Sequence, residues 1–395
     1  MVVKEGYRQT EVGLIPENWE LKKIGNLATF SNGLAHEAII SESGDYIVVN
    51  SKFISTEGQV KKFSAINLCP LYFNDIAIVM SDIPNGKALA KCYIIEKDNF
   101  YTLNQRIGSI HPKIGNCKYY FYQLNRNKYF LSFDSGVGQT NLRKQEILDC
   151  PVLIPPENEQ TAIATALSDT DALILSLERL IAKKNNIKQG AMQELLRPKD
   201  GWKNTTLGEI ASLNKGKGLG KNEITPDGRY KCIHYGELFT KYKELIYSIL
   251  SRTYVNENTL LSKRNDVLMP TSDVTPKGLA TASCLMENNV ILGGDILVIR
   301  IPENIINGVF LSYSITNDKT QILNLVKGVT VYHLYGSDMK KFRFNYPNIQ
   351  EQNNIVRILT DMETEIEALE LKLEKYKMIK QGMIQTLLTG QIRLI

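Results

Sequence analysis

The feature that most constrains this chain is an internal repeat. Residues 187–196 read IKQGAMQELL and residues 379–388 read IKQGMIQTLL, an offset of 192 positions (379 minus 187). The same offset relates Pro155 to Pro347, Glu159-Gln160 to Glu351-Gln352, Asp169 to Asp361, Gly136-Val137 to Gly328-Val329, and Gly86, Ala88, Ala90 and Cys92 to Gly278, Ala280, Ala282 and Cys284. An offset of 183 relates Trp19, Gly25, Ala28 and Gly33 to Trp202, Gly208, Ala211 and Gly216, so the copies differ by loop insertions. The chain is therefore predicted to consist of two homologous halves.

Within each half the sequence pattern changes once. From Trp19 to about Pro156 the chain contains short β-branched and aromatic runs such as DYIVVN and DIAIVM, separated by Asn, Gly and Pro, which is typical of strands and loops. After this point apolar residues recur four and three positions apart, the spacing of a coiled-coil seam. The two seams are Ile163, Leu167, Thr170, Ile174, Leu177, Ile181 and Lys184, and Ile355, Leu359, Met362, Ile366, Leu369, Leu373 and Tyr376. Pro198 and Gly390 are predicted to end the two helices.

The length of these helices indicates that they pair. About 36 residues span about 54 Å, more than the diameter of a small domain, so each helix needs a surface outside its own domain. Lys184 is expected to face Tyr376, its counterpart, and this mismatch favours an intramolecular antiparallel pair over a homodimer. The alternative is two amphipathic helices that pack on their own domains. Gly190 and Gly382, inside the helical segments, indicate either a close helix crossing or a landing surface for another subunit, or else a local kink.

The expected fold class is α+β, with two homologous mixed α/β domains separated by two long antiparallel coiled-coil helices. We place an N-terminal arm and the first domain at residues 1–158 and the first helix at 159–197. The second domain is expected at 198–350, and the second helix with a C-terminal tail at 351–395.

Composition excludes several classes of protein. The six cysteines form no CxxC pair, which argues against a zinc site or a disulfide framework. Neither a membrane span nor an apolar signal segment is apparent, so we expect a cytoplasmic protein with no membrane partner. A net charge of +5 and a pI near 8.6 permit a nucleic-acid partner without requiring one.

We find no convincing catalytic motif. Residues 216–221 (GKGLGK) resemble a phosphate loop, but Lys215 and Asn222 stand where GxxxxGK[ST] requires Gly and Ser or Thr, so we expect a flexible basic loop. The four histidines, His36, His111, His234 and His333, lack the spacing of a metal motif, and GxSxG is absent. The chain is therefore predicted to bind rather than catalyse, with no catalytic residue and no metal site.

Several segments resemble the specificity subunits of type I restriction-modification systems. They are TEVGLIPENWELKKIGNL near the start, residues 135–174 (SGVGQTNLRKQEILDCPVLIPPENEQTAIATALSDTDALI), their second copy at residues 327–366, and LLTGQIRL at the end. The resemblance covers essentially the whole chain. The second copy departs from the first with Pro347-Asn348-Ile349-Gln350 in place of Pro155-Pro156-Glu157-Asn158, and Tyr332-His333 in place of Thr140-Asn141.

The resemblance implies two target recognition domains, each of which reads one half of a bipartite, asymmetric site in double-stranded DNA. It also implies two methyltransferase subunits docked near the helices, and motor-nuclease subunits that join for restriction. S-adenosylmethionine, ATP and Mg²⁺ would then belong to the partner subunits. Two similar but non-identical readers suit a non-palindromic site, because identical readers require symmetric half-sites.

Candidate DNA-reading residues are polar side chains in loops, because such groups can bond to base edges. For the first domain we select Ser81, Asn85, Lys87, Asn104, Gln105, Arg106, Gln139, Asn141 and Arg143. For the second domain we select Lys215, Lys217, Lys221, Thr271, Ser272, Lys277, Tyr332 and His333. Two other functions compete with this one: a coiled-coil scaffold whose duplicated domains bind protein or a ligand, and an enzyme with an unrecognised active site.

Overall fold

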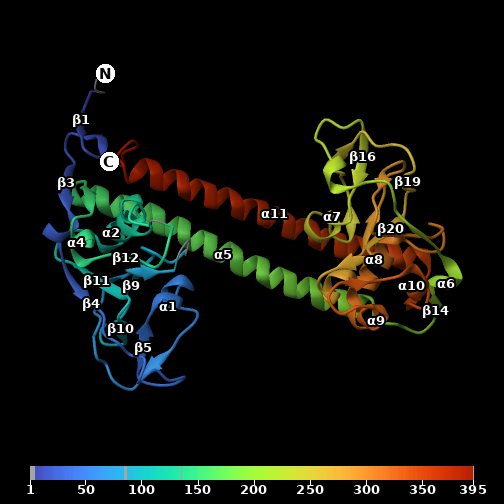
Figure 1. The fold of residues 1–395 in the computed structure, drawn as a ribbon, viewed down its shortest axis with the longest axis horizontal. Helices are drawn as coiled ribbons and strands as arrows, with labels where there is room; N and C mark the ends of the chain where they lie inside the picture. The colour runs from blue at the N-terminus through green and yellow to red at the C-terminus, as the bar shows by residue number, and fades with distance from the viewer. Residues whose placement is uncertain (1–4, 84–86, 135, 395) are drawn as a thin grey trace. The chain divides into compact units, whose positions relative to one another are not determined.

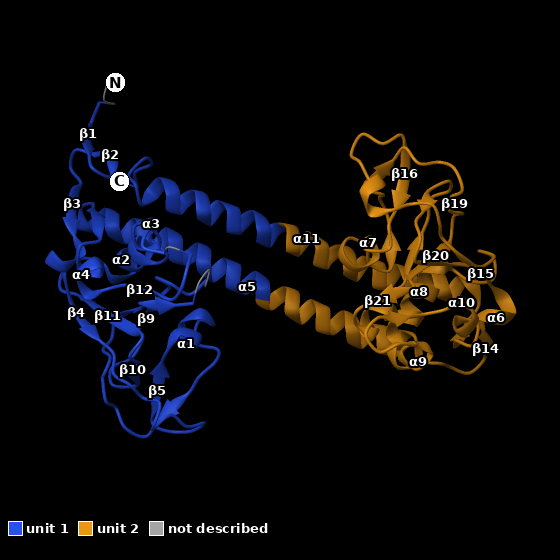
Figure 2. Ribbon diagram, viewed as in Figure 1, with its two compact units in different colours: residues 1–178, 372–395 blue, residues 179–371 orange. Residues whose placement is uncertain are grey.

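Two helices of 39 residues each organise the chain, α5 (Glu157–Leu195) and α11 (Ile349–Leu387) (Figure 1). The structure, a computed structural model, describes residues 5–83, 87–134 and 136–394. The chain divides into two compact units, unit 1 (Met1–Glu178 and Lys372–Ile395) and unit 2 (Arg179–Leu371) (Figure 2). Each long helix thus contributes one part to each unit.

Unit 1 is built on a four-stranded antiparallel sheet in the order β4-β11-β7-β9 and a three-stranded sheet in the order β10-β5-β6. Three strand pairs accompany them, β1-β2, β3-β13 and β8-β12. The strands are β1 (Tyr7–Thr10), β2 (Gly13–Pro16), β3 (Glu20–Lys23), β4 (Ala28–Asn32), β5 (Tyr46–Val49), β6 (Phe63–Ser64), β7 (Ile76–Val79), β8 (Ser81–Asp82), β9 (Cys92–Ile94), β10 (Tyr101–Leu103), β11 (Ile107–Pro112), β12 (Thr140–Asn141) and β13 (Pro151–Ile154). The short helices are η1 (Ile24–Asn26), α1 (Ser51–Ser55), α2 (Cys117–Leu124), α3 (Lys128–Leu131) and α4 (Lys144–Leu148).

Unit 2 repeats this plan with a five-stranded sheet, β15-β24-β20-β22-β17, a four-stranded sheet, β18-β16-β23-β19, and the pairs β14-β26 and β21-β25. The strands are β14 (Lys203–Thr206), β15 (Ser212–Lys215), β16 (Tyr230–Ile233), β17 (Leu245–Ile246), β18 (Ser251–Thr253), β19 (Leu260–Leu261), β20 (Asp266–Pro270), β21 (Ser272–Asp273), β22 (Ser283–Leu285), β23 (Ile291–Leu292), β24 (Ile296–Arg300), β25 (Tyr332–His333) and β26 (Arg343–Tyr346). The short helices are α6 (Leu207–Ile210), η2 (Lys221–Glu223), α7 (Glu237–Thr240), η3 (Pro276–Ala280), α8 (Gly308–Asn317), α9 (Lys319–Leu325) and α10 (Gly336–Met339).

The central strands β7 and β20 carry runs of consecutive apolar residues, Ile76–Val79 and residues 267–269, because each lies between two cores. In β7, Ile76 and Ile78 join the core that also contains residues of α2 and α5, whereas Ala77 and Val79 join a second core with β5 and β10. Successive side chains of a strand point to opposite faces, so a strand covered on both faces needs a continuous apolar run. In β20, Val267 and Met269 likewise belong to a different core from Leu268.

The α2 and α8 helices occupy equivalent places and begin in the same way. The side chain of Asn116 accepts a hydrogen bond from the Tyr119 N–H, and that of Asn307 accepts from Val309 and Phe310. An Asn at this position satisfies N–H groups that the first helical turn leaves without a partner. A glutamine of the adjacent long helix then fixes each cap: Gln160 accepts from the Asn116 N–H at 3.0 Å, and Gln352 accepts from the Asn307 N–H at 2.9 Å.

Within each unit the two long helices run antiparallel. In unit 1, Thr170 of α5 lies 3.6 Å from the Met383 sulfur of α11, and in unit 2, Lys184 of α5 donates to Glu365 of α11 at 2.8 Å. Every residue of the two predicted seams is buried or partly buried. The expectation that Lys184 faces Tyr376 is wrong. It followed the order of the repeat, whereas an antiparallel pair brings together residues whose numbers increase in opposite directions.

Gly190 and Gly382 lie inside α5 and α11, and a Cβ atom added to either would meet no atom within 4 Å in the described part of the chain. A close helix crossing would bring other backbone or side-chain atoms near these glycines. That explanation is therefore wrong within each unit, and the open surface at both glycines is consistent with a landing surface.

Candidate functional site

A shallow hollow beside the small strand pair β8-β12 gathers several polar side chains of unit 1. It has a volume of about 340 Å³ and is lined by Met80, Ser81, Gln105, Arg106, Gln139, Asn141 and Leu142. Ser81 lies opposite Asn141 in the antiparallel register, and the Leu142 N–H donates to the Met80 carbonyl at 2.7 Å. The pairing therefore brings residues about 60 positions apart in the sequence into one surface.

Two carboxylates hold the loops around this hollow. Asp82 accepts hydrogen bonds from the N–H groups of Ile83, Ala88 and Leu89, at 2.9, 2.8 and 3.1 Å. Asp134 accepts from the Gly136 N–H and the Thr140 hydroxyl, and these two bonds lower the pKa of its carboxyl. Both acids bond to backbone N–H or hydroxyl groups, and neither forms a salt bridge with Arg106 among the residues that the structure describes.

The amide and hydroxyl groups of the hollow bond to one another. Gln139 donates its Nε2 to Ser81 and, at 3.3 Å, to the Asn141 side chain, and Gln105 donates to Glu37 at 2.7 Å. The exposed Arg106 guanidinium has no hydrogen-bond or ion-pair partner among residues 5–83, 87–134 and 136–394. An unpaired guanidinium beside neutral amides can donate two parallel hydrogen bonds to a ligand that carries two adjacent acceptor atoms, either two oxygens or one oxygen and one nitrogen.

Unit 2 contains the equivalent strand pair with different side chains. Ser272 of β21 lies opposite His333 of β25, and the Leu334 N–H donates to the Thr271 carbonyl at 3.0 Å. Asp273 accepts from the Val274 N–H at 2.7 Å, as Asp82 does from Ile83. The same local structure thus presents Thr271, Ser272 and His333 where unit 1 presents Met80, Ser81 and Asn141.

A carboxylate lies at the edge of this second surface. The Asp295 side chain forms an ion pair with Lys215 Nζ at 3.0 Å and accepts a longer hydrogen bond from the Thr271 hydroxyl, at 3.4 Å. Both partners of the ion pair are substantially exposed, 64% for Lys215 and 46% for Asp295, so the pair can open at little cost in free energy.

The structure brings together part of the predicted set. Ser81, Gln105, Arg106, Gln139 and Asn141 share the first hollow, and Lys215, Thr271, Ser272, Tyr332 and His333 lie around the second strand pair. Of the remaining predicted residues, Asn104 is buried, Lys87 is exposed on the segment between β8 and β9, and Lys277 is exposed in η3, which contacts β21 and β25. Arg143 precedes α4, and Asn85 lies outside the described residues.

The loop at residues 216–221 is fixed at its start and carries two of the predicted lysines. The Gly216 N–H donates to Ile296 at 2.8 Å and the Lys217 N–H to Leu292 at 3.1 Å, while Lys221 begins η2. A Cβ on Gly216 would lie 2.2 Å from the Gly293 carbonyl oxygen, so only glycine fits this close approach of two backbones.

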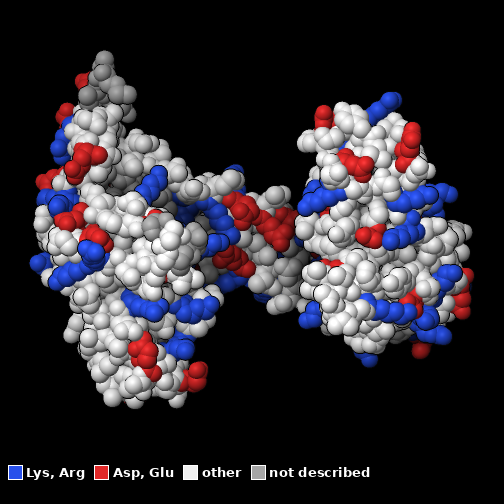
Figure 3. Space-filling view, viewed as in Figure 1, with Lys and Arg blue, Asp and Glu red and all other residues white. Residues whose placement is uncertain are grey.

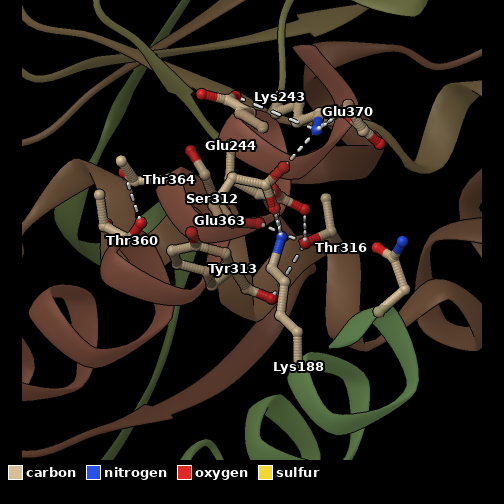
Figure 4. Close-up of polar contacts among 12 residues, drawn as sticks. Lys188, Lys243, Glu244, Ser312, Tyr313, Thr316, Thr360, Glu363, Thr364 and Glu370 are labelled. Carbon is tan, nitrogen blue, oxygen red and sulfur yellow. Dashed lines mark hydrogen bonds and ion pairs between the residues drawn. The ribbon is translucent and has the colours of Figure 1, made fainter. Parts of the chain in front are cut away.

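Sequence reasoning missed two features. Asp295 was not selected, because its equivalence to a residue of the first half appears only once the strands are paired. The second is a buried ion network in unit 2, where Lys188 of α5 contacts Glu363 of α11 and lies 3.5 Å from Glu244 (Figure 4). Lys243 also contacts Glu363, and the Lys188 ammonium lies 5.5 Å from the Tyr313 ring centroid.

Unit 1 has the same arrangement with the halves exchanged. Lys380 of α11 contacts Asp171 of α5 and lies 6.0 Å from the Tyr122 ring, whose hydroxyl donates to Asp171 at 2.7 Å. Lys188 and Lys380 are the lysines of the repeated IKQG segments. Each unit therefore joins the acid and tyrosine of one half to the lysine of the other half.

Charge alone does not mark a functional face. In the view of Figure 3, Lys and Arg lie across the surfaces of both units, and acidic side chains gather on the middle part of the long helices. The described residues include no helix apolar and long enough to cross a membrane, and no group of three or more His, Cys, Asp or Glu residues arranged to hold a metal ion.

Comparisons with known proteins agree across the whole chain. The family model described as "Type I restriction modification DNA specificity domain" matches residues 16–189 and again residues 199–375. The MjaVIII specificity subunit of a type I restriction enzyme from Methanocaldococcus jannaschii is 22% identical over 420 residues, covering 99% of this chain and 96% of that protein.

Solved structures share the fold. The S subunit of a type I restriction-modification system from M. genitalium superimposes with a TM-score of 0.62 at 16% identity, covering 94% of this chain and 96% of that one. A chain from a study of complex assembly and conformational transition in the type I R-M system gives a TM-score of 0.58 at 14% identity, with 96% and 99% covered.

Proposed function

Because the chain belongs to the family of type I restriction modification DNA specificity domains, which matches both of its halves, we propose that it selects the DNA sequence on which a type I restriction-modification complex acts. Each unit reads one half of a bipartite, asymmetric site. The observation that carries this proposal is the duplicated strand pair, β8-β12 and β21-β25, which has one backbone arrangement and two sets of polar side chains. Equal geometry with unequal chemistry suits two different half-sites.

The partners in this proposal are double-stranded DNA, two methyltransferase subunits and motor-nuclease subunits. The solved chain from the study of complex assembly supports an assembled state for the family, and the open helix surfaces at Gly190 and Gly382 are available for docking. S-adenosylmethionine, ATP and Mg²⁺ belong to the partners, and this chain itself catalyses no step. The alternative of a coiled-coil scaffold without DNA specificity finds no support in the family match.

The proposal is tested by combining the purified chain with methyltransferase subunits from the same genome and mapping the methylated bases on random-sequence DNA. We expect a single gapped site with two unlike halves, and binding whose affinity falls steeply as salt rises, because phosphate contacts release counterions. The chain alone should neither methylate DNA nor hydrolyse ATP. Methylation without sequence preference, or turnover by the isolated chain, would contradict the proposal.

A further inference from the structure

Units 1 and 2 carry opposite charges at one equivalent backbone position. In unit 1 the Arg106 carbonyl accepts a hydrogen bond from the Met80 N–H at 3.0 Å, and in unit 2 the Asp295 carbonyl accepts from the Thr271 N–H at 2.9 Å. Met80 and Thr271 directly precede the first strand of each small pair. Arg106 and Asp295 therefore lie at the same place beside the two candidate reading surfaces.

We infer that Arg106 contacts a guanine in the half-site read by unit 1, and that Asp295 contacts the amino group of a cytosine or adenine in the half-site read by unit 2. The inference rests on the proposed function and assigns two specificity-determining residues. The same fold position thereby selects an acceptor edge in one half-site and a donor edge in the other.

The surroundings of Arg106 favour guanine. The guanidinium is exposed and unpaired within the described residues, and Ser81, Gln139 and Asn141 beside it are uncharged. Of the acids around the hollow, Asp82 and Asp134 accept hydrogen bonds from backbone N–H groups and Glu37 accepts one from Gln105. A planar guanidinium that carries two parallel donors matches guanine O6 and N7 in the major groove, and cytosine and adenine present a donor that it cannot pair with at the same place.

The carboxylate of Asp295 disfavours guanine. A carboxylate accepts hydrogen bonds only, so it repels the O6 and N7 acceptors of guanine and the O4 of thymine, and it can accept from the amino groups of cytosine and adenine. The Asp295 backbone has a φ of 60°, a conformation that Asp and Asn adopt more readily than most residues. The neighbouring cation is the exposed Lys215, which can turn to a phosphate when a base amino group takes its place.

The experiment uses the complete complex with its methyltransferase subunits and a DNA library in which every position of both half-sites is varied. Arg106→Ala is expected to reduce the preference for guanine at one position of one half-site by about 5- to 140-fold and to leave the other half-site unchanged. Asp295→Asn keeps the backbone conformation but adds two N–H donors, so it is expected to admit guanine at one position of the other half-site.

Lys87→Ala and Lys277→Ala are the matched controls, because Lys87 is exposed on the segment after β8 and Lys277 is exposed in η3, which contacts β21 and β25. They should weaken binding to all sequences equally, as phosphate contacts do. The inference is overturned if Arg106→Ala weakens binding to all sequences equally, or if it changes the preference in both half-sites. It is also overturned if the base position at which Arg106→Ala loses selectivity is not guanine in the site preferred by the unmodified protein. The inference is likewise overturned if the complex with Asp295→Asn still excludes guanine at every position of the half-site read by unit 2. If the complex with the unmodified chain methylated no bipartite site, this result would instead contradict the proposed function.

Discussion

The buried network around Lys188 allows a prediction for the stability of unit 2. The Lys188 and Glu363 side chains are only 13% and 11% exposed, so Lys188→Met leaves the Glu363 carboxylate buried with one cation, Lys243, in place of two. Breaking a fully buried pair costs about 3–5 kcal/mol, and the remaining Lys243 contact reduces this to about 2–3 kcal/mol. Methionine keeps the apolar stem of lysine, so the change reports mainly on charge.

The assay is hydrogen exchange of the full chain, followed by mass spectrometry of peptides from each unit. A loss of about 2–3 kcal/mol should accelerate exchange in the most protected amides of α8 and of the first half of α11 by about 30- to 140-fold. Peptides of α2 in unit 1 should not change. Burial tends to raise the pKa of Glu363, but the hydrogen bonds from Lys188 and Lys243 outweigh burial, so the pKa is lowered. Because Lys188→Met removes one of these hydrogen bonds, it should raise the pKa of Glu363.

Lys184→Met is the control, because Lys184 and Glu365 form a more exposed pair on the same two helices, with side chains 32% and 52% exposed. Such a pair contributes less than about 1 kcal/mol. If both variants accelerated exchange equally, or if Lys188→Met affected unit 1 more than unit 2, burial would not be what makes the Lys188–Glu363 pair stabilising.

Three further predictions concern Lys380, Glu159 and Gly190. Lys380→Met should destabilise unit 1 and spare unit 2 in the same exchange assay, and less than Lys188→Met does, because its pair with Asp171 is more exposed. Burial tends to raise the pKa of Glu159, but the hydrogen bonds from Arg393 and Trp19 lower it. The ionised Glu159 should therefore stabilise unit 1 above a pH of about 4.5, and this stabilisation should disappear as the pH falls through the lowered pKa. Between about pH 7 and pH 3, the free energy of unfolding in urea should accordingly fall less for Glu159→Gln than for the unmodified chain. Gly190→Ala should raise the free energy of unfolding by about 1 kcal/mol, because alanine favours a helix and the added Cβ meets open space. Urea unfolding measures this change, and a decrease in the free energy of unfolding would contradict the prediction.

The repeat and the long helices could be predicted because they depend on local sequence. An offset of 192 residues and a four-three apolar spacing are visible without any knowledge of tertiary contacts, and α5 and α11 lie where that spacing indicated. The predicted opposition of Lys184 and Tyr376 was wrong because it matched residues by the order of the repeat, whereas in an antiparallel pair the numbers of the facing residues run in opposite directions.

The candidate site could be predicted only in part. Gln139 and Asn141 were selected by chemistry, but their association with Arg106 depends on the pairing of β12 with β8, about 60 residues earlier, and on the hydrogen bond from Met80 to the Arg106 carbonyl. Asp295 was missed because loop insertions shift its equivalent by a different offset from the one that relates the helices. The equivalence of Arg106 and Asp295 therefore cannot be recognised from the sequence alone, because the loops differ in length, and it is recognised once the strands are paired.

The composition of unit 1 has a consequence for the order in which the chain can fold as it leaves the ribosome. The core of this unit includes Leu387 and Leu388, and Arg393 bonds to the buried Glu159, which also accepts from the Trp19 indole. The first residues of unit 1 therefore cannot complete their core until Leu387, Leu388 and Arg393 have been synthesised, whereas unit 2 has all its residues once Leu371 has been added. A chain cut before Leu387 would lack core residues of unit 1, the unit whose first part is translated before unit 2.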